Sequence, residues 1–272
     1  MSTIEVPDQA GFTVAIEQRE GSDWSVATIT LNRPDVLNAQ HPVMWRALAR
    51  VGADLPGSVR VVVLRGAGRA FSAGLDRTLF TPTGVQSGEG LMAIAAGTAE
   101  QASATIAEFQ GAFSWLTRPD LVSVAVVHGH AIGAGFQLAL ACDLRIVVSD
   151  AQFTMAEPTL GLVPDLGGTK RLVELVGYSR AASICLTGRR VDAREADRIG
   201  LASLLVEPDA VPAALEQTIA GLLSVSRDAA VETKALLLAA SGRSQREQEA
   251  AEREAQYRRL RDLAFLFSES PA

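Results

Sequence analysis

Three short apolar runs constrain the fold of this chain more than any other feature of its sequence. They occupy residues 59–64, 122–127 and 144–148, and most of their residues are valine, isoleucine or leucine. Continuous apolar runs of this length are typical of strands buried on both faces, as in parallel sheets. Other stretches, such as 41–54, repeat apolar residues at helical spacing, so strands and helices alternate along the chain. We therefore predict an α/β fold around a largely parallel sheet.

The two ends of the chain carry different patterns. Residues 12–18 and 26–31 have the pattern of strands, and the turn sequence Asn-Arg-Pro-Asp follows the second. From about residue 169 onward the pattern is helical. Residues 244–261 are rich in Glu, Gln and Arg, which predicts a helix with a solvated face. The apolar end at 263–267 requires a partner surface, within the subunit or across an interface.

Length and composition indicate a globular protein that binds a small ligand. The 272 residues, 48% of them hydrophobic, suffice for a sizeable core. A formal net charge of -6 gives no sign of a nucleic-acid surface. The longest apolar stretches are much shorter than the ~20 residues that a membrane span needs. We therefore expect neither nucleic acid nor a membrane as a partner.

The cysteines, the histidines and the N-terminal residues predict a reduced, cytoplasmic setting without a metal site. Only Cys142 and Cys185 are present, and the first 18 residues contain no Lys or Arg and no long apolar run, unlike a signal peptide. The histidines, His41, His128 and His130, show no metal-ligand spacing with the two cysteines.

The sequence Arg-Ala-Phe-Ser-Ala-Gly-Leu-Asp at residues 69–76 follows the first buried run. Small residues and Gly74 predict exposed backbone N–H groups, because glycine allows the following amide to turn outward. A free amide in a dry pocket is a good donor to a developing oxyanion. Taken alone, the segment fits a plain structural turn equally well. The next residues, 81–90, are rich in Gly, Pro and Ser and predict a loop beside the site.

A glycine-rich junction between strand and helix follows the second buried run. Residues 128–143 contain Gly133, Ala134 and Gly135 where the helical pattern begins. The first N–H groups of a helix lack internal partners and the helix dipole favours negative charge there, so an anion or enolate can bind. A dinucleotide site is the alternative, but the spacing is not G-x-G-x-x-G and no clear acidic partner ends a second strand.

A third segment, residues 153–169, places two carboxylates in apolar surroundings. Glu157 and Asp165 lie eight residues apart among apolar, Gly and Pro residues. Desolvation there raises carboxyl pKa values and makes these groups useful proton carriers near neutral pH. Each also has a structural alternative. Asp165 could cap the helix that begins near Gly168, and Glu157 could pair with an arginine.

These three segments, in this order and with these separations, resemble the crotonase superfamily (enoyl-CoA hydratase/isomerase family). The resemblance covers roughly residues 12–265 and includes an early turn at 32–39 and a helical stretch at 186–201. It implies an α/β fold, a crotonase-like spiral of repeated β-β-α units with a helical C-terminal region, assembled as a homotrimer or a dimer of trimers. We accordingly expect a core with the CoA and oxyanion site at 1–205, and at 206–272 a helical region for active-site cover and oligomerisation.

The resemblance also implies roles for single residues. By position, the backbone N–H groups of Leu75 and Ala134 form the oxyanion hole. Ala73 lies by the adenine of CoA, and Arg69, with Arg77 as second choice, contacts a CoA phosphate. No metal or redox cofactor is implied, because coenzyme A enters as part of the acyl-CoA thioester substrate.

One catalytic position departs from the family pattern. Hydratases of this family hold the added water with two glutamates; Glu157 matches the second, but Gln137 stands at the first. A glutamine can orient a water but cannot accept its proton at ordinary pH. Asp165 matches a place where some isomerases carry a catalytic aspartate. The pattern therefore favours isomerisation of an enoyl-CoA double bond by Glu157 with Asp165, with enoyl-CoA hydration or a non-catalytic acyl-CoA-binding protein as alternatives.

Overall fold

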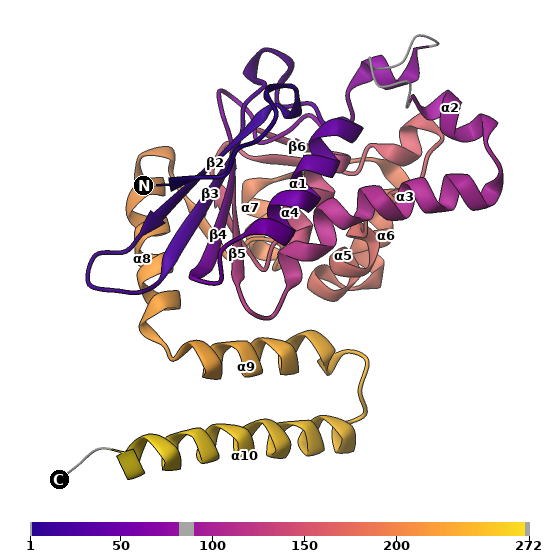
Figure 1. The fold of residues 1–272 in the computed structure, drawn as a ribbon. Helices are drawn as coiled ribbons and strands as arrows, with labels where there is room; N and C mark the ends of the chain where they lie inside the picture. The colour runs from indigo at the N-terminus through magenta and orange to yellow at the C-terminus, as the bar shows by residue number, and fades with distance from the viewer. Residues whose placement is uncertain (1, 82–89, 270–272) are drawn as a thin grey trace.

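A seven-stranded sheet forms the centre of the computed structural model, in the spatial order β1-β2-β3-β4-β5-β7-β10 (Figure 1). The pairings of β2 with β1 and β3 are antiparallel, and the other pairings are parallel. The strands are β1 Ser2–Thr3, β2 Phe12–Gln18, β3 Ser25–Leu31, β4 Val59–Gly66, β5 Val122–Val127, β7 Leu144–Val148 and β10 Leu204–Val206. The three apolar runs are thus the adjacent parallel strands β4, β5 and β7, as predicted.

The structure describes residues 2–81 and 90–269, so nearly all of the loop predicted at 81–90 lies outside the described residues. A second, three-stranded sheet consists of β6 His130–Ile132, β8 Gln152–Thr154 and β9 Arg190–Asp192. Isolated bridges add to this layer, because Ser72 pairs with Ala131 and Gln40 pairs with Leu75. The strands β3, β4, β5 and β7 are therefore each followed by a short extended segment and then by helix. This repetition confirms the predicted spiral of β-β-α units.

Helices surround the sheets and complete each repeat (Figure 1). The α-helices are α1 Pro42–Asp54, α2 Leu91–Ala96, α3 Ala99–Ser114, α4 Ala134–Ala141, α5 Gly168–Val176, α6 Tyr178–Thr187, α7 Ala193–Arg198, α8 Val211–Ser224, α9 Arg227–Ala240 and α10 Gln245–Glu269. Short 3-10 turns are η1 Asp8–Ala10, η2 Pro34–Val36, η3 Arg77–Phe80, η4 Trp115–Thr117, η5 Glu157–Leu160 and η6 Pro208–Ala210. His41 caps α1 by accepting the Met44 N–H at 3.3 Å.

The central strands carry continuous apolar runs because both of their faces are buried. Val62 and Leu64 of β4 face the main core, whereas Val61 and Val63 face a smaller cluster that α8 closes with Ile219. Ile219 is 4% exposed, and full burial of such a side chain contributes about 1.5–3 kcal/mol. The first helix after residue 206 thus covers one face of the sheet, and the division of the chain after residue 205 stays a prediction.

The last two helices form an antiparallel pair below the sheets in Figure 1. Two ion pairs join α9 to α10: Glu232 with Arg258 at 2.6 Å, and Asp228 with Arg259 at 3.3 Å. Although α10 spans 25 residues, its charges make it too polar for a lipid core. Across the described ranges, no helix combines the length and the apolar character needed to cross a bilayer.

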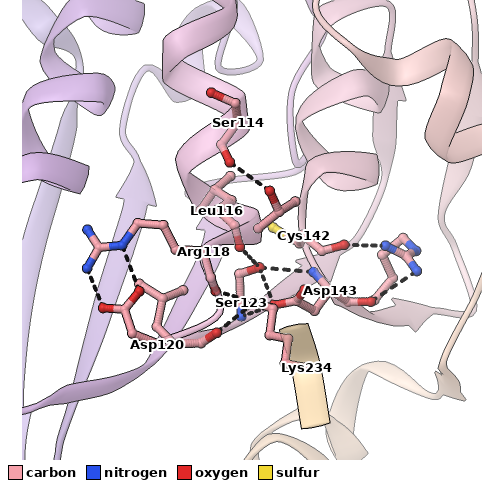
Figure 2. A network of polar contacts seen from close by, with 11 residues as sticks. Ser114, Leu116, Arg118, Asp120, Ser123, Cys142, Asp143 and Lys234 are labelled. Atoms are coloured by element: carbon pink, nitrogen blue, oxygen red, sulfur yellow. Dashed lines mark hydrogen bonds and ion pairs between the residues drawn. The ribbon is translucent and has the colours of Figure 1, made fainter. Parts of the chain in front are cut away.

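A partly buried lysine joins α9 to the sheet. Lys234 Nζ donates to Asp143 Oδ2, to Leu121 O and to Arg118 O, each at 2.7 Å (Figure 2). The Asp143 carboxylate also accepts the backbone N–H of Ser123 at 2.8 Å. Burial lowers the pKa of Lys234, and the charge of Asp143 opposes that shift.

Candidate active site

The backbone N–H of Leu75 points away from its neighbouring segment. Gly74 O accepts the N–H of Gln40 at 2.7 Å, and the Asp76 N–H donates to Gln40 O at 2.8 Å. The C=O and N–H of a trans peptide point in opposite directions, so the Leu75 N–H faces away from Gln40. Among residues 2–81 and 90–269, no acceptor receives this N–H.

The backbone N–H of Ala134 is a second free donor. Gly133 precedes α4 with φ +51°, and its own N–H donates to Thr154 O at 2.8 Å. The Ala134 N–H, first in the helix, has no acceptor within the described part of the chain. A methyl group on Gly74 would stand 3.3 Å from Ala134 N. The segments that carry the two free donors therefore lie side by side.

Glu157 brings a carboxylate to the start of α4. A methyl group on Gly133 would stand 3.1 Å from Glu157 Oε1, a tight contact with the carboxylate, and the positive φ of Gly133 also favours glycine there. Glu157 Oε1 accepts a hydrogen bond from Gln137 Nε2 at 2.7 Å. Its other oxygen, Oε2, is buried and without a partner among the residues that the structure describes.

The environment of Glu157 favours its neutral form. Burial raises the pKa of Glu157, the hydrogen bond from Gln137 opposes this rise, and the charge of Asp165 adds to it. No arginine forms an ion pair with Glu157 in the described ranges. The interpretation of Glu157 as the partner of an arginine is therefore wrong.

Gln137 is 1% exposed and its amide is held at both ends. Its Oε1 accepts the backbone N–H groups of Leu166 at 2.9 Å and of Gly168 at 3.2 Å. Backbone N–H groups can only donate, so this end of the amide is the oxygen and the NH₂ group faces Glu157. Gly168 is the first residue of α5, and the Gln137 oxygen therefore satisfies one of the free donors at that helix start.

Asp165 does not cap α5, and this structural alternative is also wrong. The residue before the helix is Gly167, with φ +88°, which has no side chain to act as a cap. The N–H of Gly168 donates to Gln137 rather than to the Asp165 carboxylate. The turn at Gly167 instead exposes the helix start to the oxygen of Gln137. Burial raises the pKa of Asp165, and its charge also acts on Glu157. The structure thus brings Gln137, Glu157 and Asp165 together.

Arg69 and Arg77 flank the first segment with exposed side chains. Neither guanidinium forms an ion pair or hydrogen bond with the described residues, in contrast to Arg33, which pairs with Asp76 at 2.9 Å. Ala73 is half-buried between them. The predicted contacts of these three residues with CoA stay predictions.

The sequence reading missed a buried polar network beneath the first segment. Asn38, Gln40 and Ser72 are each 0% exposed and hydrogen-bond to one another or to nearby backbone. Polar residues immediately before the apolar helix at 41–54 were the available signal. His41 is not a proton carrier near neutral pH, because burial lowers its pKa to about 4. In the described ranges, no group of three His, Cys, Asp or Glu side chains could hold a metal ion.

Comparisons with known proteins agree with this arrangement. The family model described as enoyl-CoA hydratase/isomerase matches residues 21–264. A Rhizobium meliloti protein named "Probable enoyl-CoA hydratase" is 37% identical over 186 residues, 68% of this chain and 66% of that protein. The peroxisomal Delta(3,5)-Delta(2,4)-dienoyl-CoA isomerase of Arabidopsis thaliana is 34% identical over 187 residues, again 68% and 66%. The matched region spans just under two thirds of either relative's length.

A solved structure covers more of the chain. The protein of Thermobifida fusca YX, provisionally named an enoyl-CoA hydratase and bound to acetoacetyl-CoA, shares 46% identity and superposes with a TM-score of 0.86. The match covers 94% of this chain and 96% of that one. Since the family model matches most of the chain and the fold agrees, this protein is an enzyme of the enoyl-CoA hydratase/isomerase family, within the crotonase superfamily.

Proposed function

We propose that this protein isomerises the carbon–carbon double bond of an enoyl-CoA, with Glu157 as the proton carrier and the N–H groups of Leu75 and Ala134 as an oxyanion hole. The free donors at both positions support this assignment, as does the acetoacetyl-CoA bound to the similar Thermobifida fusca protein. Arg69 and Arg77 would contact the CoA phosphates beside Ala73. The reduced cysteines expected from the sequence are consistent with work in the cytoplasm.

The proposed reaction needs one base and one oxyanion site. Ionised Glu157 removes a proton from the α carbon of a 3-enoyl thioester, and the C–H electron pair enters an enolate whose oxygen lies at the N–H groups of Leu75 and Ala134. This enolate is conjugated with the double bond between the β and γ carbons. Glu157 then returns the proton to the γ carbon, and the double bond ends between the α and β carbons.

The direct contact of Gln137 with Glu157 is the observation that carries this proposal. A water held between two side chains needs about 2.7–2.8 Å to each oxygen, which separates those side-chain atoms by well over 4 Å. Here Gln137 Nε2 and Glu157 Oε1 are 2.7 Å apart. Because two backbone donors hold its oxygen, Gln137 cannot rotate to offer Glu157 or a water an acceptor. This geometry favours proton transfer by one carboxylate over water addition by two.

A product screen in heavy water tests the proposal. Incubation with 3-enoyl-CoA and 2-enoyl-CoA thioesters, followed by mass spectrometry, should detect double-bond migration and little 3-hydroxyacyl-CoA. Deuterium should enter the acyl chain to the extent that the proton on Glu157 exchanges with solvent before it is returned. Gln137→Glu should increase water addition relative to isomerisation, because it restores a second carboxylate. Rapid hydration of 2-enoyl-CoA by the wild-type protein, with Glu157→Gln harmless, would refute the mechanism.

Asp165 is a second candidate proton carrier beside Glu157, and Asp165→Asn separates this role from a purely electrostatic one. The charge of Asp165 raises the pKa of Glu157, so its removal should lower that pKa and move the acid limb of the pH–rate profile to lower pH. A fall in turnover comparable to that of Glu157→Gln would make Asp165 a proton carrier. A shifted profile with the same maximal rate would limit Asp165 to tuning Glu157.

A further inference from the structure

We infer that Gln40 and Ser72 are positioning residues that set the spacing between the N–H groups of Leu75 and Ala134. The inference rests on the proposed function, because it assumes that these two groups bind one oxyanion. Stabilisation of an oxyanion requires both donors within about 2.7–3.1 Å of the same oxygen. Leu75 lies in an irregular segment, so its position depends on what holds that segment against the start of α4.

Ser72 contacts both segments. Its backbone N–H donates to His130 O at 2.9 Å, and its backbone O accepts the Ile132 N–H at 3.0 Å. A methyl group on Gly135, in the first turn of α4, would stand 2.5 Å from Ser72 O. On the other side, Ser72 Oγ accepts the N–H of Gly74 at 3.2 Å. The peptide that carries the Leu75 N–H begins at Gly74, so Ser72 joins that peptide to the start of α4.

Gln40 holds the Ser72 hydroxyl in place. Gln40 Nε2 donates to Ser72 Oγ at 3.0 Å, and Gln40 Oε1 accepts the indole N–H of Trp45 at 2.8 Å. The Ser72 hydroxyl in turn donates to Asn38 O at 2.8 Å. The Ser72 hydroxyl thus donates one hydrogen bond and accepts two, from Gln40 and from the Gly74 N–H, so its full hydrogen-bonding capacity is used and its orientation is fixed. The Gln40 backbone also bonds to the residues on both sides of Leu75.

The cost of this network argues for a role beyond packing. Gln40 and Ser72 are 0% exposed, and burial of a polar group is favourable only when its hydrogen bonds are made. An apolar pair of similar volume would fill the space without this requirement. The polar pair adds directional contacts, and these act on the Gly74–Leu75 peptide.

Acetoacetyl-CoA and CoA together provide the test. Acetoacetyl-CoA can bind as an enolate, which ultraviolet absorption detects, whereas CoA has no acyl carbonyl. The wild-type protein should bind acetoacetyl-CoA more tightly than CoA. Ser72→Ala and Gln40→Leu should each reduce this preference by about 10-fold or more, the scale expected for a small displacement of a binding group, with the Kd for CoA unchanged. The double variant should be no worse than the more severe single variant, because both act through one network.

Ser123→Ala is the matched control. Ser123 is also 0% exposed, and its hydroxyl bonds to Leu116 O, Asp143 Oδ2 and the Asp143 N–H. It should lower Tm and leave the ratio of the two Kd values as in the wild type. The inference is overturned if Ser72→Ala and Gln40→Leu also lower Tm only. Should Ser72→Ala fail to fold, Gln40→Leu and Trp45→Phe provide the same measurement with Ser72 in place.

Failure of the proposed function has a different signature. If the wild-type protein neither forms the enolate nor prefers acetoacetyl-CoA to CoA, both the proposed oxyanion hole and the inference about Gln40 and Ser72 are wrong. If enolate forms but 3-enoyl-CoA is not isomerised, the proposed reaction fails and the Gln40 and Ser72 variants still decide the inference.

Discussion

The proposed role of Glu157 in proton transfer conflicts with its contribution to stability. Because burial raises its pKa above the ordinary 4.5, the folded protein binds a proton at Glu157 more tightly than the unfolded chain does. Stability therefore falls as the pH rises from the unfolded pKa through the raised folded pKa, and it stays lower above that window. The unpartnered Oε2 is part of the same cost.

Glu157→Gln should consequently produce a protein that is more stable and much less active. We expect turnover to fall by about 100-fold or more, the usual scale for loss of a general base. Thermal unfolding should show a higher Tm than wild type at pH 7, because glutamine removes the stability cost of the raised carboxyl pKa, and the difference should shrink as the pH falls through the unfolded pKa of 4.5. A lower Tm at pH 7 would mean that the site stabilises the carboxylate.

Arg69 and Arg77 are the residues to test for CoA affinity. Their exposed guanidiniums have no partner among the described residues, and a charge-assisted contact with phosphate contributes about 1.5–3 kcal/mol. Arg69→Ala should weaken CoA binding by about 10-fold at physiological salt, and Arg77→Ala by less. Isothermal titration with CoA measures both, with Arg194→Ala on the exposed side of α7 as the control. An unchanged affinity of Arg69→Ala for CoA would refute the proposed contact between Arg69 and a CoA phosphate.

At the scale of elements, one largely buried ion pair joins α9 to the central sheet. The side chains of Lys234 and Asp143 are 11% and 15% exposed and 2.7 Å apart. Removal of one partner leaves an uncompensated buried charge, which typically costs about 3–5 kcal/mol. Lys234→Met should reduce the free energy of unfolding by roughly that amount in urea titrations and expose α9 to limited proteolysis. Adding Asp143→Asn should recover part of the loss, and a variant as stable as wild type would contradict the anchoring role.

The sequence predicted elements well where burial is uniform along a strand. The bounds of the strands Val122–Val127 and Leu144–Val148 were predicted correctly, because both faces are covered and every position after the first is buried. The three-residue strands β6, β8 and β9 were not predicted, since so short a segment contains no measurable period. Gly129, with φ +55°, also separates His128 from β6, which begins at His130, so the two histidines do not lie on one continuous strand.

For the candidate site, too, the sequence predicted some features and missed others. The residues proposed to carry the chemistry, such as Glu157 and Gln137, could be singled out from the sequence because each falls in a recognisable segment. Their partners could not, because those contacts join distant parts of the chain. Gln137, rather than the nearby Asp165, supplies the acceptor at the start of α5, and Gln40 meets Ser72 from 32 residues away. Local patterns cannot predict such contacts, because tertiary packing decides which of several polar groups reaches a free donor.

At the scale of the whole molecule, α10 carries apolar side chains that are about half or more exposed in the described part of the chain. Tyr257, Leu260, Leu263 and Phe265 are between 49% and 63% exposed. All four residues belong to α10, which packs along α9 and lies apart from the sheets (Figure 1). Such a surface is typical of an interaction site, and closed symmetric assembly would cover it in every subunit. A homotrimer or a dimer of trimers therefore stays our prediction.

Sedimentation velocity at micromolar concentration tests this prediction directly. Each chain has a mass of 28.7 kDa, and the wild-type protein should sediment with three or six times that mass. Leu260→Glu should shift the distribution toward smaller species, because it places a charge where an apolar contact is expected. Met92→Glu is the control, since Met92 is 66% exposed on α2, at the other end of the molecule (Figure 1). A wild-type protein that remains monomeric would show that α10 is not an assembly surface.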